Sequence, residues 1–77
     1  MITAGIDVGA VSIKIVILDK DNGILASNII PTTVDSRKAA QKALDKTLED
    51  GGLKFEDIGY ILGTGSGRFN ISFISRQ

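Results

Sequence analysis

Apolar side chains recur at alternate positions in two early segments of the chain, and this period of two predicts two β-strands. The first runs from Ile2 to Asp7 and the second from Ser12 to Leu18. The stretch from Asp19 to Gly23 ends in Asn-Gly, a strong hairpin signal because both residue types tolerate a positive φ. A third strand, Ile24 to Ile30, should therefore follow directly, and Pro31 should close it because proline lacks the amide proton that a ladder needs.

A spacing of three and four residues then replaces the alternation and predicts one amphipathic helix. Asp35 or Ser36 can act as its N-cap. Gly51 and Gly52 offer the left-handed conformation that ends a helix, and Leu53 can fold back on the last turn. The apolar stripe consists of Ala40, Ala43, Leu44, Thr47 and Leu48.

A short apolar run, Tyr60 to Leu62, predicts a fourth strand that leads into a glycine-rich loop. The order is then β-β-β-α-β, and a helical crossover normally returns a strand parallel to one already in the sheet. We expect the fourth strand beside the first. The turn from Asp7 to Ser12 and the loop from Thr64 to Arg68 would then emerge together, at the edge where open α/β sheets bind ligands.

Composition narrows the classes of function. The 77 residues allow one domain, with nine basic and nine acidic residues and no net charge, so neither a nucleic-acid partner nor a membrane partner is expected. Cysteine and histidine are absent, which removes thiolate nucleophiles, histidine bases and the usual zinc or iron–sulfur ligands. With no apolar run of membrane-span length and no basic signal region, a cytoplasmic location is expected. Tyr60 and the three phenylalanines are expected in the core.

The first turn carries a candidate phosphate site. Gly9 lets backbone amides approach an anion, and Ser12 and Lys14 can add a hydroxyl and a positive charge. A carboxylate would repel phosphate directly, so Asp7 makes sense as a ligand of Mg²⁺ through water. The alternative is a plain hairpin in which Asp7 and Gly9 are turn formers and Lys14 is solvated.

The second candidate is the glycine-rich stretch from Gly63 to Arg68. Its evenly spaced glycines fit neither the P-loop nor the dinucleotide fingerprint. They suit either a flexible connector or a nest of backbone amides from which Arg68 reaches an anion or a carboxylate.

Two longer stretches together resemble one protein family. "GIDVGAVSIKIVILD" is similar to the first phosphate motif of the superfamily of acetate and sugar kinases, heat-shock chaperone ATPases and actin. "ILGTGSGRFNISF" is similar to the Thr-Gly-Tyr-Gly-Arg segment of the ATPases that form benzoyl-CoA reductase subunits and 2-hydroxyacyl-CoA dehydratase activators, with Ser66 where those proteins have tyrosine. The resemblance covers essentially the whole chain and implies a ribonuclease H-like half-domain of the actin-like ATPase fold.

The resemblance also implies a function and a set of site residues. The family consists of ATP-driven electron-transfer activators, homodimers that share a four-iron four-sulfur cluster and act on a reductase or dehydratase component. It implies Mg-ATP as cofactor and a Mg²⁺-associated carboxylate at Asp7. The phosphate-loop positions would be Gly9, Ala10, Ser12 and Lys14, and the second segment, near the nucleotide cleft, would contribute Thr64, Gly65, Gly67 and Arg68.

Full members of this family are several times longer, with a second phosphate loop, an adenosine-binding segment and the cluster cysteines. We therefore expect residues 1–77 to be one N-terminal half-domain that does not turn over alone and that self-associates through an open sheet edge. Two alternatives remain: part of a sugar or acyl kinase with the same first motif, and a non-enzymatic actin-like assembly module whose glycine loops are only turns.

Overall fold

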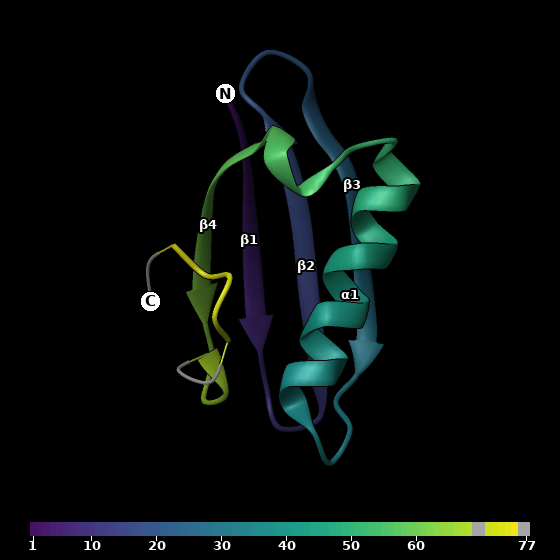
Figure 1. Cartoon of the computed structure of the whole chain (residues 1–77), viewed down its shortest axis with the longest axis vertical. Coiled ribbons are helices and arrows are strands. Elements are labelled where there is room, and N and C mark those ends of the chain that lie inside the picture. Colours follow the sequence, from purple (N-terminus) through teal and green to yellow (C-terminus); the bar gives the residue numbers. More distant parts are fainter. Residues whose placement is uncertain (69–70, 76–77) are drawn as a thin grey trace.

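The chain folds into a four-stranded mixed sheet with one helix packed on one face (Figure 1). The computed structural model describes residues 1–68 and 71–75. The strands are β1 (Ile2–Val8), β2 (Ser12–Asp19), β3 (Gly23–Pro31) and β4 (Ile58–Thr64); the helix is α1 (Ser36–Gly51), and a 3₁₀ turn, Phe55–Asp57, precedes β4. No helix in the described ranges is long and apolar enough to cross a membrane.

The strand order is β3-β2-β1-β4, so the predicted β-β-β-α-β arrangement and the predicted place of β4 beside β1 are confirmed. β2 is antiparallel to both β1 and β3, and β4 is parallel to β1. As a result, the carboxyl ends of β1 and β4 lie at one end of the sheet, together with the start of β2 (Figure 1). Both candidate loops emerge at this end.

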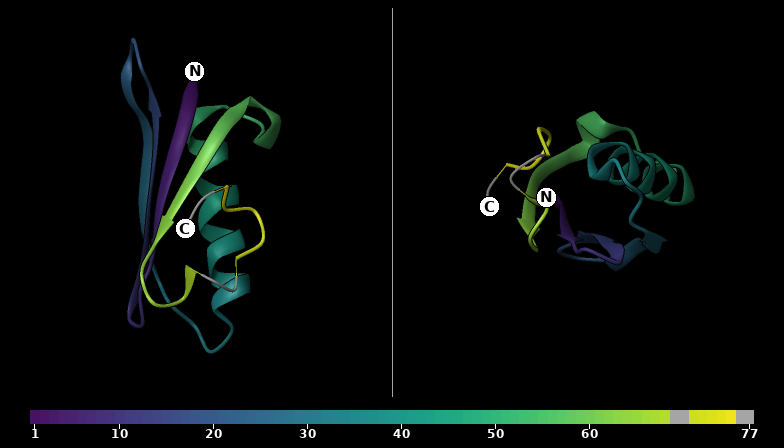
Figure 2. Two further views of the ribbon diagram at one scale, coloured as in Figure 1. Left: turned by 90° about the vertical axis from the view of Figure 1, so that its left-hand side faces the viewer. Right: turned by 90° about the horizontal axis from the view of Figure 1, so that it is seen from below.

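The core lies between the sheet and α1, on what we call the covered face. Alternate residues of β1 and β2 point into it, and Val8, Ile13 and Ile17 are completely inaccessible to solvent. Three of the six buried residues of the helix are alanines, and side chains this small let the helix approach the strands closely. Figure 2 shows α1 on this one side of the sheet.

The opposite, open face carries no helix in the described part of the chain (Figure 2). It is formed by the other set of alternate strand positions, with charged residues at one end and mostly apolar or small residues over the rest. Its residues include Gly5, Asp7, Lys14, Val16, Leu18, Ile24, Ser27, Ile29, Leu62 and Thr64.

The helix ends where the sequence predicts. The Asp35 carboxylate caps the first turn by accepting hydrogen bonds from two of its amides. At the other end, Gly52 has a φ of 66°, and the Leu53 amide donates to the Leu48 carbonyl at 2.9 Å. These contacts satisfy backbone groups that a helix end leaves unpaired.

The β2–β3 turn differs from a two-residue Asn-Gly hairpin. Asp19 pairs with Gly23, which leaves three residues in the loop, and of this loop and its glycine only Gly23 has a positive φ, of 78°. Asn22 acts through its side chain instead, since its Nδ2 donates to Asp19 Oδ2 at 2.7 Å. β3 begins at Gly23 and includes Pro31, one residue more at each end than expected.

The outer edge of β4 is partly covered. Ser75 donates its amide to the Ile61 carbonyl at 2.8 Å, and its Oγ accepts the Ile61 amide at 3.0 Å. The side chain of Ile74 lies over Gly63, where an added Cβ would collide with Ile74 Cδ1. The expectation of an open edge at β4 is therefore wrong at Ile61, because Ile74 and Ser75 lie against this strand.

The aromatic residues are less buried than expected. Phe55 is 48% exposed, because it lies in the short 3₁₀ turn outside the sheet–helix interface, so its expected place in the core is wrong. Tyr60 and Phe73 are partly buried, and Phe69 lies outside the described residues. The core is aliphatic instead.

Candidate phosphate-binding end

Strand register places three of the predicted site residues in one row. Asp7 pairs with Lys14 across β1 and β2, and with Thr64 across β1 and β4. All three side chains are exposed on the open face. Neither Asp7 nor Lys14 forms an ion pair within residues 1–68 and 71–75, so both charges remain available to a ligand.

The β1–β2 turn beside this row has amides that the fold does not use. Gly9 donates its own amide to the Ser12 carbonyl at 3.1 Å, and an added Cβ at Gly9 would lie 2.9 Å from that oxygen. Gly9 therefore shapes the turn. The amides of Ala10 and Val11 donate no hydrogen bond within the described residues, and they are the donors that remain for an anion.

Thr32 fixes the tip of this turn, a role that the sequence did not reveal. Its Oγ1 donates to the Gly9 carbonyl at 2.9 Å, and its amide donates to the Val11 carbonyl at 2.9 Å. The residue that follows β3 thus holds both sides of the β1–β2 turn. Nothing local in the sequence around Thr32 signals this contact, because it joins residues more than twenty positions apart.

The glycine-rich loop after β4 packs directly on the end of β1. Gly65 has a φ of 92°, and a Cβ added there would lie 2.6 Å from Asp7 Oδ1 and 2.5 Å from the Val8 carbonyl oxygen. The Gly67 amide donates to that same carbonyl at 2.9 Å. The glycines therefore let the second loop approach the Asp7 carboxylate closely.

Two hydrogen bonds tie Arg68 to its own loop. Its Nη1 donates to the Gly65 carbonyl at 2.6 Å, and the Arg68 amide bonds to the same oxygen at 3.3 Å. The guanidinium thus stabilises the turn that brings Gly65 onto Asp7. Its predicted contact with an anion stays a prediction.

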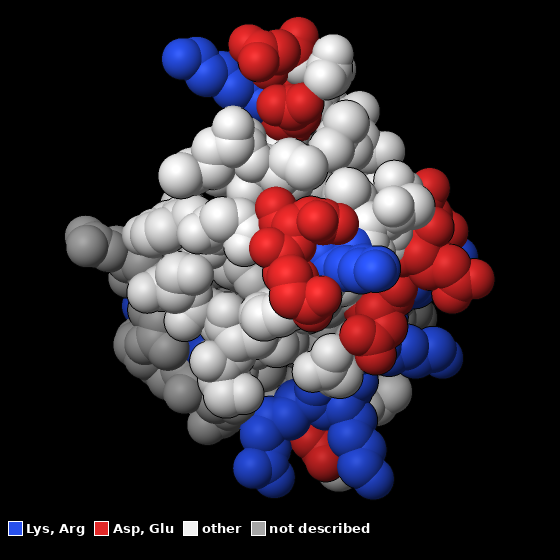
Figure 3. All heavy atoms as spheres, turned by 45° about the horizontal axis from the view of Figure 1, so that its top comes forward, with Lys and Arg blue, Asp and Glu red and all other residues white. Residues whose placement is uncertain are grey.

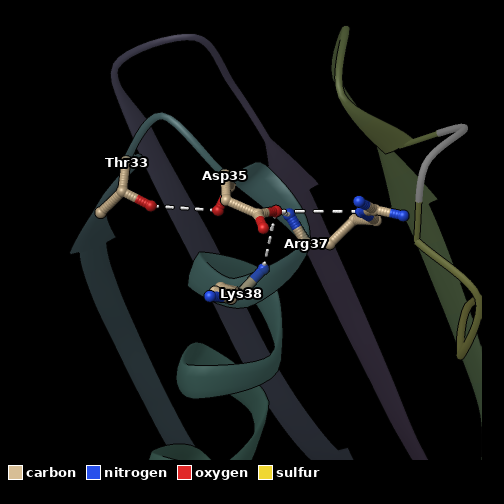
Figure 4. A network of polar contacts seen from close by, with 4 residues as sticks. All are labelled: Thr33, Asp35, Arg37 and Lys38. Atoms are coloured by element: carbon tan, nitrogen blue, oxygen red, sulfur yellow. Dashed lines mark hydrogen bonds and ion pairs between the residues drawn. The ribbon is translucent and has the colours of Figure 1, made fainter.

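The start of α1 lies at this same end of the molecule (Figure 1). The Asp35 carboxylate accepts the amides of Arg37 at 3.1 Å and Lys38 at 3.3 Å, and Thr33 Oγ1 donates to the Asp35 carbonyl at 3.0 Å (Figure 4). Arg37 Nε also lies 3.8 Å from the Asp35 carboxylate. The first turn of the helix contains basic residues and no acidic ones.

Charge is divided between the two ends of the molecule. Six of the nine acidic residues belong to the end of β2, the β2–β3 turn, the last turn of α1 and the 3₁₀ turn, at the end that Figure 3 brings forward. They are Asp19, Asp21, Glu49, Asp50, Glu56 and Asp57. An anion is therefore favoured at the end with the glycine loops and disfavoured at the other.

The open face is hollowed next to the row of Asp7, Lys14 and Thr64. The hollow has a volume of about 390 Å³ and continues over Gly5, Val16 and other apolar residues of the sheet. Gly5 lines this hollow and leaves room in it, because glycine has no side chain. A ligand bound at the polar row would thus have an apolar surface beside it.

The donor set can be tested against the expected Mg²⁺. No group of three or more side chains suited to a metal occurs in the described ranges, so Asp7 would be a single protein ligand. Mg²⁺ keeps several waters and takes one or two carboxylates, so one exposed carboxylate beside phosphate-binding amides fits this ion. It does not fit zinc, which requires three or four protein ligands.

Sequence comparison places the chain among known proteins, although no family model matches it. It is 47% identical over 77 residues to the activator of lactoyl-CoA dehydratase from Anaerotignum propionicum, and covers 29% of that protein. It is 37% identical over 70 residues to a benzoyl-CoA reductase subunit from Thauera aromatica, and covers 25% of it.

Structural comparison agrees. The whole chain superposes on component A of (R)-2-hydroxyglutaryl-CoA dehydratase from Acidaminococcus fermentans with a TM-score of 0.90 and 28% identity, covering 30% of that chain. The activator of 2-hydroxyisocaproyl-CoA dehydratase from Clostridium difficile, solved with bound ADPNP, gives a TM-score of 0.87 and 35% identity, with 28% of that chain covered. An ROK hexokinase from Thermus thermophilus shares the fold, with a TM-score of 0.69 and 19% identity over 84% of this chain. The predicted actin-like ATPase fold is confirmed.

Proposed function

Because the chain is homologous over its whole length to the activators of 2-hydroxyacyl-CoA dehydratases, of which it spans less than a third, we propose that it forms one wall of a Mg-nucleotide site. In this proposal the amides of Ala10 and Val11, with Ser12 and Lys14, bind the phosphates, and Asp7 holds Mg²⁺ through water. The bound nucleotide supplies the free energy of phosphoanhydride hydrolysis.

The observation that carries the proposal is the register of β1 with both neighbours. It puts Asp7, Lys14 and Thr64 in one row beside two unused turn amides, although they come from distant parts of the sequence. A carboxylate and an ammonium side by side, next to donors without partners, match a phosphate group together with its metal ion. A plain hairpin would not need this combination.

The loop from Thr64 to Arg68 acts in this proposal as a support for the carboxylate. Gly65 lies against Asp7, and Gly67 is bonded to the end of β1, so the loop limits where the Asp7 side chain can turn. The role proposed for Thr64, Gly65, Gly67 and Arg68 is thus to position the metal-associated carboxylate, with Thr64 Oγ1 facing the ligand.

For the protein that contains this wall, we propose ATP-driven electron transfer to an acyl-CoA dehydratase or reductase component, the class of activity that its relatives' names describe. The chain has no cysteine, so it contributes no thiolate to the four-iron four-sulfur cluster expected from the resemblance. The sugar or acyl kinase alternative has less support, since the hexokinase shares the fold at only 19% identity.

The proposal can be tested on this chain by NMR titration with Mg²⁺ and ADPNP. We expect the amide signals of Ala10, Val11, Lys14 and Thr64 to move, and those of the β2–β3 turn to stay in place. A Lys14→Met variant should bind at least about tenfold more weakly, because it loses one charge-assisted hydrogen bond to phosphate. Asp7→Asn should bind in Mg²⁺ no better than the unchanged chain binds with the metal removed.

Matched controls are available at the acidic end. Lys20→Met and Asp21→Asn make the same chemical changes in the exposed β2–β3 turn and should leave the titration unaltered. If the largest shifts map to that turn, or if Lys14→Met binds like the unchanged chain, the phosphate site does not lie between the two glycine loops.

A further inference from the structure

The open face exposes large apolar side chains that a folded chain of this size normally covers. Leu18, Ile24, Ile29 and Leu62 are 38%, 66%, 71% and 45% exposed, respectively. They come from three different strands but share this one face of the sheet. A contiguous patch of this kind marks a surface that meets another molecule.

The residues of this face are arranged in matched rows about the middle of the sheet. The middle is the line between β1 and β2, with one further strand on each side. One row reads Thr64, Asp7, Lys14 and Ile29 from β4 to β3, and the next reads Leu62, Gly5, Val16 and Ser27. In the first row the opposite charges of Asp7 and Lys14 flank the line, and in the second row each larger residue has a small one at the equivalent place across the line.

We infer that this face binds a second copy of the chain, face to face, about a two-fold axis that runs along the line between β1 and β2. Such a rotation puts β1 of one copy over β2 of the other. Asp7 then faces Lys14 of the second copy, and Lys14 faces its Asp7, so two opposite-charge contacts form by symmetry. The strands of the two sheets run in nearly the same direction, as in an aligned sandwich.

The same rotation matches shape as well as charge. Gly5 faces Val16 of the second copy, and the 390 Å³ hollow above Gly5 gives that side chain a place to enter. Leu62 faces the small Ser27. In this row large residues thus meet small ones, which is how facing layers interdigitate at native density.

A two-fold axis perpendicular to the strands does not give this match. If it passed through the row of Gly5 and Val16, Asp7 would face Thr3 and Lys14 would face Leu18. Both charges would then be desolvated against uncharged residues of the second copy, which is costly. The charge pattern therefore selects the axis along the strands. This surface is distinct from the sheet edges, one of which is already bonded by Ser75 at Ile61.

The arrangement is tested by a charge swap between two populations of the full chain, followed by sedimentation without nucleotide. The unchanged chain should show a particle of twice its 8.2 kDa mass as concentration rises. Asp7→Lys puts lysine against lysine, and Lys14→Asp puts aspartate against aspartate. Each variant alone should therefore dimerise at least about tenfold more weakly.

An equimolar mixture of the two variants should regain the dimer, because every charged contact in the mixed pair is again between opposite charges. Matched controls are Lys20→Asp and Asp21→Lys in the β2–β3 turn, which should dimerise alone like the unchanged chain. Far-UV circular dichroism checks that each variant is folded.

Three results would overturn the inference. The unchanged chain could stay a monomer up to about 1 mM. The single variants could dimerise as well as the unchanged chain, or the mixture could fail to restore a dimer that each folded variant has lost. Because no nucleotide is present, these results are independent of whether Asp7 and Lys14 bind Mg-ATP.

Discussion

The two faces of the sheet are made by the same strands, and they differ in almost every respect. Successive positions of β1 and β2 alternate between them, so Ile6 and Asp7, or Ile13 and Lys14, are neighbours in sequence with opposite surroundings. The covered face is aliphatic and closed by α1, whereas the open face holds the charged row, the hollow and the exposed apolar residues. Stability and ligand chemistry are thus separated within single strands, one residue apart.

The largest effect on stability is expected when one isoleucine on each face is truncated to alanine and the two variants are compared. Ile13→Ala removes a side chain that is completely buried and should lower the free energy of unfolding by about 3 kcal/mol. Ile29→Ala removes one that is 71% exposed and should change it by less than about 0.5 kcal/mol. Urea denaturation of the dilute, monomeric chain measures both. Similar losses for the two variants would contradict the division between the faces.

A smaller effect is expected where the glycine loop crosses the end of β1. Gly65→Ala should cost about 2 kcal/mol, because the residue has a positive φ and the new Cβ would come within 2.6 Å of Asp7 Oδ1. Gly23→Ala is the matched control, with a φ of 78° and no atom within 4 Å of the new Cβ, and should cost about 1 kcal/mol. Thermal unfolding of both variants gives the difference, and equal costs would mean that the loop does not press on Asp7.

The covered face contains a buried polar contact, between β3 and α1. Removing it should lower the free energy of unfolding by a smaller amount still. Thr47 is fully buried, donates to the Ala43 carbonyl at 2.6 Å and accepts Asn28 Nδ2 at 2.9 Å. Thr47→Val keeps the shape and should cost about 1 kcal/mol through the lost hydrogen bonds. Thr3→Val, on the open face, should cost less than about 0.5 kcal/mol. If Thr47→Val were neutral in urea denaturation, the contact between β3 and α1 would not contribute to stability.

Local patterns predicted most of the fold, because the features involved are themselves local. Alternation specified β1 and β2, and the Asp35 cap and Gly52 fixed the ends of α1. The position of β4 beside β1 followed from the general behaviour of helical crossovers. The sequence therefore sufficed to predict that the two candidate loops lie at the same end of the sheet.

The rest depended on contacts between distant residues. Thr32 holding the β1–β2 turn and Ser75 bonding to Ile61 join segments whose meeting no local pattern indicates. The same holds for the amide of Gly9, which the hairpin uses, leaving Ala10 and Val11 as the available donors. Phe55 was misplaced because aromatic character predicts burial only on average, and its short turn lies outside the core.

The smallest expected effect is competition between nucleotide binding and dimerisation, the two functions inferred for the open face. Mg-nucleotide and a second copy of the chain both require Asp7 and Lys14, so binding of one must weaken binding of the other. At a nucleotide concentration equal to its dissociation constant, each of the two protomers contributes a factor of two, and the dimer dissociation constant should rise about fourfold, or about 0.8 kcal/mol. Sedimentation with and without Mg-ADPNP measures this change, and a titration with Mg²⁺ alone is the control. A dimer that is indifferent to nucleotide, although the nucleotide binds, would mean that the second copy sits on a different surface, because two ligands that share the same pair of charges cannot bind independently.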